Sequence, residues 1–117
     1  MRTSIVMTSK EINGAQAMQL VDYWKQVKLG KALEDGDLAV TIDYVAELKI
    51  EDEKGEKEPF TSYVFVTTEN KMYVTSSRPL YSHVIDKLLE SENQPVAVTI
   101  GKRVSLRDSS KTYFILV

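Results

Sequence analysis

The sequence predicts a mainly β domain in which five antiparallel strands curl into a small barrel. The chain has 117 residues, 43% of them hydrophobic, with five glycines and three prolines, a composition typical of one packed domain. Apolar residues alternate with a period of two over the long stretches 38–50 and 96–106. A helical apolar pattern lies between these stretches. We therefore treat residues 1–117 as a single domain.

The first 36 residues are expected to form an extension ahead of the barrel. Residues 3–8 are short and β-prone. A helix is predicted over residues 14–28, because Asn13 is a good N-cap and apolar residues recur at helical spacing. These apolar positions are Ala17, Leu20, Val21 and Trp24. The helix is expected to end near Gly30, with Trp24 in the core or in a dimer contact.

The barrel itself is predicted over residues 37–117 and begins with a long strand. From Leu38 to Ile50 the even-numbered residues are apolar and predict one buried face. The charged run Glu51–Glu58 surrounds a glycine and reads as a solvated hairpin tip. Residues 60–68 and 72–76 then form a second hairpin.

A helix and two further strands complete the predicted order. The helix starts at residues 77–79, with Pro79 in its first turn, and stops before Pro95. Strands follow over residues 96–106 and 112–117. The order β-β-β-α-β-β is that of the OB-fold, a small and partly open Greek-key barrel. The competing interpretation is an α+β fold in which a flat sheet packs on two helices.

Composition limits the chemistry that the chain can perform. It has no cysteine and one histidine, which excludes disulfides, thiolate zinc sites and cysteine nucleophiles. Gly-rich nucleotide loops and serine-nucleophile elbows are absent from the sequence. The carboxylates Asp35, Asp37, Asp43 and Glu47 are close in sequence, but no motif organises them as a nuclease site. We expect a protein that is not an enzyme and needs no cofactor or metal.

Charge is distributed unevenly along the chain. The net charge is −2, but residues 1–70 carry 8 basic and 13 acidic residues, whereas residues 71–117 carry 7 and 4. One end of the molecule should therefore be acidic and the other mildly basic. No apolar run approaches the ~20 residues of a membrane span, and no signal peptide is evident, so a cytoplasmic location without membrane contact is expected.

Residues 63–77, the following short amphipathic helix, the basic strand at 98–105 and the aromatic last strand resemble small single-stranded DNA-binding proteins of phages and mobile elements. The similarity covers about residues 38–117. It implies an OB-fold that binds single-stranded DNA without strong sequence preference during replication or recombination. It also implies homo-oligomers, contacts with replication or recombination proteins, and a host-cell cytoplasmic location for a phage protein. The chain departs from the better-known bacterial members, because it ends in an apolar strand instead of an acidic tail.

Binding of single-stranded nucleic acid needs aromatic faces for bases and cations for phosphates. Tyr63 and Phe65 share one face of the predicted second strand and Tyr73 lies on the next, so we expect these rings to face outward. The alternatives are that Phe65 lies in the core, that Tyr63 is an aromatic residue at an edge, and that Tyr73 makes ordinary cross-strand contacts. The densest positive stretch surrounds residues 102–111 and is expected to contact phosphates, although a solvated hairpin would look the same. The predicted interface comprises Tyr63, Phe65, Lys71, Tyr73, Arg78, Lys102, Arg103, Arg107, Lys111 and Tyr113.

A second function remains open on the same fold. The acidic first half of the chain, including Glu51–Glu58, could serve a small inhibitor or assembly factor, because an acidic surface can mimic DNA to a basic partner. His83 lies off the apolar stripe of its helix and is expected on the surface.

Overall fold

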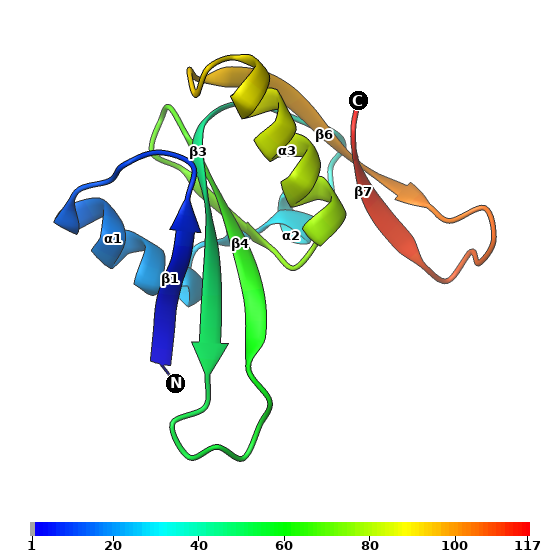
Figure 1. Cartoon of the computed structure of the whole chain (residues 1–117). Helices are drawn as coiled ribbons and strands as arrows, with labels where there is room; N and C mark the ends of the chain where they lie inside the picture. The colour runs from blue at the N-terminus through cyan, green and yellow to red at the C-terminus, as the bar shows by residue number, and fades with distance from the viewer. Residues whose placement is uncertain (1) are drawn as a thin grey trace.

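The computed structural model describes residues 2–117, with the backbone alone for Tyr23. It is mainly β, and its strands form one curled, half-barrel sheet (Figure 1). The sheet has seven strands instead of the predicted five, because two short strands of the N-terminal extension join it. Their order is β2-β5-β4-β3-β6-β7, with β1 paired to β3 outside this path.

The N-terminal extension folds into several short elements. These are β1 (Arg2–Thr8), α1 (Gly14–Val21), the 3-10 turn η1 (Tyr23–Lys25), β2 (Val27–Lys28) and α2 (Leu29–Ala32). Asn13 caps α1 as predicted: its side chain accepts from the Gln16 amide at 2.8 Å, and the Gln16 side chain accepts from the Asn13 amide at 3.0 Å.

The predicted helix over residues 14–28 is wrong beyond Val21. Helix α1 buries Leu20 completely against the sheet, and the chain then leaves the helical path. Val27 and Lys28 pair in parallel with Tyr73 and Val74 of β5. Tertiary pairing along this sheet edge therefore overrides the local helical pattern.

The remaining strands follow the predicted chain order. They are β3 (Leu38–Glu51), β4 (Phe60–Thr67), β5 (Met72–Thr75), β6 (Val96–Val104) and β7 (Thr112–Leu116), with α3 (Arg78–Glu90) between β5 and β6. The long β3 organises the sheet. One edge of β3 pairs with β4, while the other pairs with β6 near its start and with β1 near its end.

A bulge in β3 decides which side chains face which side of the sheet. Ile42 pairs with Thr67 and Tyr44 pairs with Val66, so Asp43 is an extra residue in the ladder. Because side chains alternate along a strand, one extra residue exchanges the two faces. Ile42 therefore packs with Val45, and the predicted single face of even-numbered residues is divided between two cores.

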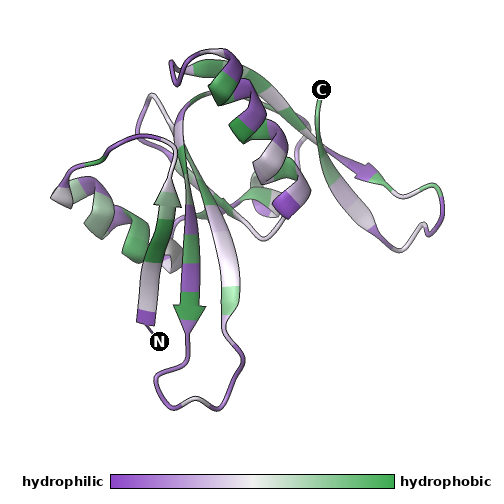
Figure 2. Cartoon of the chain, in the orientation of Figure 1, coloured by the Kyte–Doolittle hydropathy of each residue, from purple (hydrophilic) through white to green (hydrophobic). Residues whose placement is uncertain are grey.

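The two cores lie on opposite faces of the sheet. The first includes α2 and α3 and contains Leu29, Phe65 and Leu80. The second includes α1 and β1 and contains Leu20, Tyr44 and Val64. Figure 2 shows apolar residues concentrated on the strands and inner helix faces, while the β3–β4 loop that projects from the body is hydrophilic. The hairpin formed by β4 and β5 is consequently covered on both faces.

Helix α2 directly follows β2, the strand at one edge of the sheet, and approaches β7, the strand at the other edge. Its Leu29 and the following Leu33 are buried in the first core, together with Tyr73 of β5. Gly30 approaches the Phe114 ring of β7 so closely that a Cβ there would lie 3.9 Å from it. Helix α2 thus lies between the two edge strands, β2 and β7, which do not pair with each other.

Candidate nucleic-acid interface

The prediction that three rings face outward is wrong. Tyr63, Phe65 and Tyr73 expose 5%, 0% and 9% of their surface. All three lie in the first core, and the Tyr63 ring stacks on Tyr81 of α3 with centroids 4.2 Å apart. Val64 and Val66, which alternate with these rings along β4, lie in the second core under α1. These three rings therefore offer no exposed face on which a base could stack.

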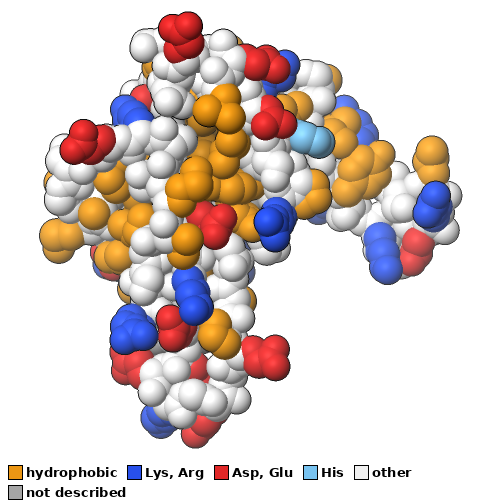
Figure 3. Space-filling view, in the orientation of Figure 1, with side chains coloured by type: hydrophobic (Ala, Val, Ile, Leu, Met, Phe, Trp, Pro, Cys, Tyr) orange, Lys and Arg blue, Asp and Glu red, His pale blue; other side chains and the backbone are white. Residues whose placement is uncertain are grey.

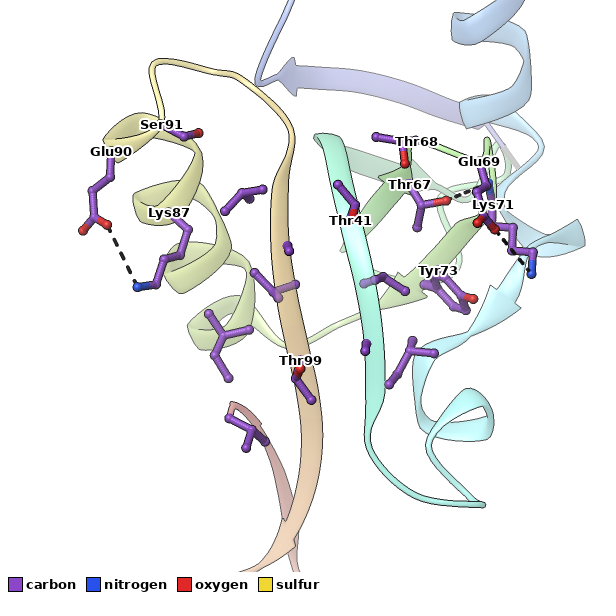
Figure 4. Close-up of a pocket in the computed structure, with 18 residues that line it drawn as sticks. Thr41, Thr67, Thr68, Glu69, Lys71, Tyr73, Lys87, Glu90, Ser91 and Thr99 are labelled. Carbon is purple, nitrogen blue, oxygen red and sulfur yellow. Dashed lines mark hydrogen bonds and ion pairs between the residues drawn. The ribbon is translucent and has the colours of Figure 1, made fainter.

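Lys71 lies in a groove at another part of the molecule (Figure 4). This groove has a volume of about 870 Å³ and runs over the paired β3 and β6. The end of α3 forms one wall, and the turn between β4 and β5 forms the other. Lys71 pairs with Glu69 at 3.9 Å and Lys87 pairs with Glu90 at 4.0 Å, so these charges balance within each wall.

Five predicted residues lie together on the hairpin formed by β6, β7 and the turn between them. We call residues 102–113 the arm, because this hairpin extends away from the body (Figure 1). Arg103 pairs with Tyr113, and Lys102 pairs with Phe114 just past the end of the arm. The arm contributes Lys102, Arg103, Arg107, Lys111 and Tyr113 of the predicted interface.

The turn at the tip of the arm is ordered by its own hydrogen bonds. The Asp108 carboxylate accepts from the Ser110 amide at 3.0 Å and from its hydroxyl at 2.6 Å, which holds the pKa of Asp108 below its ordinary value. The Lys111 amide donates to the Asp108 carbonyl at 3.0 Å. The positions of Arg107 and Lys111 at this tip are therefore set by a defined turn.

Arg103 is held by a carboxylate at the base of the arm. Its two terminal nitrogens donate to the two Asp37 oxygens at 3.0 and 3.2 Å. This bidentate bond lowers the pKa of Asp37 and raises the pKa of Arg103. A Cβ at Gly101 would lie 2.7 Å from the guanidinium and 2.9 Å from the carboxylate, so the glycine leaves the space for this pair. Arg103 thus tethers the arm to the turn after α2.

Arg78 lies at the same end of the molecule as the arm. It is the first residue of α3, and the first turns of this helix lie beside β7 in both Figure 1 and Figure 4. We define the arm surface as Arg78 together with the five predicted residues of the arm. Apart from Arg103, which is half-buried, these side chains are exposed.

Trp24 is an exposed aromatic residue outside the predicted interface. Trp24 is 62% exposed on η1, so it lies outside the core, and its predicted place in a dimer contact stays a prediction. Met18 and Val27 are exposed nearby in the chain. The closely spaced lysines at positions 25, 28 and 31 indicate that the segment next to Trp24 is exposed to solvent. The prediction that His83 is exposed is confirmed, and Figure 3 shows it on the surface.

The carboxylates near the start of β3 bind lysine or arginine. Asp37 is paired with Arg103, and Lys10 donates to both Asp43 oxygens at 2.8 and 2.9 Å. Within residues 2–117, histidines and carboxylates form no group of three that could hold a metal ion. None of the helices in that range is long and apolar enough to cross a membrane.

Comparison with known proteins found no match among protein-family models, curated proteins or solved structures.

Proposed function

We propose that the chain is a non-enzymatic protein that binds single-stranded DNA through the arm surface. The observation that carries this proposal is the arm itself: cations and an exposed tyrosine gather on an ordered hairpin that projects from the body. Between Lys102 and Lys111, four basic residues accompany one acidic residue. Replication or recombination of a phage or mobile element is the setting that the sequence resemblance implies.

The connectivity of the sheet supports an OB-type barrel for this function. Strands β3, β4 and β5, then α3, then β6 and β7 follow the OB order, and β3 pairs with both β4 and β6. OB-folds bind oligonucleotides on the face of their second and third strands and on the flanking loops. In this chain α1 covers that face of β4 and β5. We therefore assign binding to the loop between the last two strands, β6 and β7.

Each part of the arm surface has a separate role in this proposal. Lys102, Arg107, Lys111 and Arg78 neutralise successive phosphates, and Tyr113 offers a ring on which one base stacks. Stacking on an aromatic ring contributes about 1–3 kcal/mol per base. Arg103 orients the hairpin through Asp37, and a phosphate would have to share or replace that carboxylate.

The test removes the two cations at the tip of the arm. We expect Arg107→Ala with Lys111→Ala to weaken binding of an oligo-dT strand and to reduce the slope of log K against log salt by about 0.7 per lost contact. Fluorescence anisotropy across a salt series measures both quantities. Lys25→Ala with Lys28→Ala removes the same charge from exposed positions outside the arm and should leave binding no weaker. Equal affinity of the wild-type protein and the arm variant would refute the proposal.

A second candidate function rests on the β3–β4 loop. This loop projects from the end of the sheet opposite to the arm and is rich in carboxylates (Figure 1). Phe60 at its base is 45% exposed. An acidic projection with an apolar residue at its base suits a basic protein partner, as expected for an assembly factor or inhibitor.

A further inference from the structure

The molecule has two projections of opposite charge. We call residues 51–58 the acidic loop; it holds five acidic and two basic residues, a net charge of −3. Residues 102–111 of the arm hold four basic residues and one acidic residue, a net charge of +3. In Figure 3 charged side chains gather on both projections, which point away from the body in different directions.

The two projections cannot neutralise each other within one chain. The acidic loop begins at Glu51, the last residue of β3, whereas Leu38 at the start of β3 pairs with Ile100 and the arm continues beyond that pair. The 14 residues of β3 therefore separate them. At physiological ionic strength, exposed charges this far apart are screened from each other, since the Debye length is about 8 Å.

Both projections also expose apolar side chains. On the arm, Leu106 is fully exposed, while Val104 and Tyr113 expose 55% and 47% of their surface. At the base of the acidic loop, Phe60 exposes 45%. Charge alone makes a weak surface contact, but apolar side chains at both projections supply the buried area that a specific contact needs.

From these observations we infer that the arm of one copy docks on the acidic loop of a second copy. The partner is a second copy because the charges are complementary: each copy carries both the acidic loop and the basic arm, at opposite ends of β3. The contact is head-to-tail, so it uses two different surfaces and extends into chains or rings instead of stopping at a symmetric dimer. The acidic loop occupies the same cations that the proposed function assigns to phosphates.

The experiment measures mass by sedimentation velocity without nucleic acid. The wild-type protein should associate at about 0.02 M salt and dissociate at about 0.5 M, because salt screens exposed charges. Two variants separate the surfaces: Arg107→Gln with Lys111→Gln on the arm, and Glu56→Gln with Glu58→Gln on the acidic loop. Each variant alone should be monomeric at low salt, whereas Lys25→Gln with Lys28→Gln should associate like the wild type.

The mixture of the two variants gives the sharpest result. The arm variant keeps an intact acidic loop, and the loop variant keeps an intact arm, so an equimolar mixture should form a complex of two chains and nothing larger. A monomeric wild-type protein at low salt, or association that persists in both variants alone, would overturn the inference. Failure of oligo-dT binding would leave these masses unchanged, so this result is independent of the proposed function.

Discussion

At the scale of single residues, Tyr44 is a fully buried side chain that lacks a hydrogen bond. Its hydroxyl has no partner among the described residues, and burial raises the pKa of Tyr44, followed by the effect of the Asp43 charge. We expect Tyr44→Phe to leave the free energy of unfolding unchanged or to raise it by up to about 1 kcal/mol, because it removes an unsatisfied buried group. Urea denaturation measures this difference.

Tyr81→Phe is the matched control for that substitution. Tyr81 is also buried, but its hydroxyl donates to the Met7 Sδ atom at 3.6 Å. Loss of a partnered hydroxyl should lower stability, so the two Tyr→Phe variants should move in different directions. A loss above about 1 kcal/mol in Tyr44→Phe would show that this hydroxyl is satisfied in solution.

The same Tyr81 gives stability a dependence on alkaline pH. Burial, then the charge of Glu47 and the neighbouring Tyr63, raises the pKa of Tyr81 to about 12. An unfolded tyrosine ionises near pH 10, so above that pH the unfolded state releases a proton that the folded state keeps. The stabilising contribution is complete below about pH 10 and is lost as pH rises toward about 12. Stability of the wild type should therefore fall more steeply than that of Tyr81→Phe over this range, and parallel curves would contradict the assignment.

At the scale of elements, alternation and capping residues predicted the positions of the main strands and of α3. The N-cap residue Asn13 also marked the start of α1 correctly. The end of α1 could not be read from the sequence, because pairing of Val27 with Tyr73 across the fold stops the helix. A local pattern contains no information about such a distant partner.

The presence of a second core under α1 explains the largest error about the candidate site. Periodicity assigned the even-numbered residues of β3 to one face, and the alternating side chains of β4 were then assigned relative to a single core. With a second core under α1, β4 has no exposed face, because its side chains are buried on both sides of the sheet. The arm was predictable, since its cations lie close together in sequence on one hairpin.

At the scale of the whole molecule, the N-terminal extension contributes to both cores. Leu20 lies in the second core, and Leu29 and Leu33 lie in the first. Strand β1 also covers the edge of β3 from Ala46 to Glu51. The expected boundary near residue 36 therefore separates the extension from the barrel in sequence but not in packing.

We accordingly expect a chain that begins at residue 37 to lose its cooperative thermal unfolding. It would lack three buried leucines, and loss of one buried leucine side chain alone typically costs about 2–5 kcal/mol. It would also expose an unpaired edge of β3, which favours aggregation. Circular dichroism and calorimetry measure the transition. Replacing residues 52–58 by an Asn-Gly turn removes exposed loop residues and leaves both cores intact, so this matched control should unfold cooperatively. A sharp transition in the chain from residue 37 would show that the barrel folds without the extension.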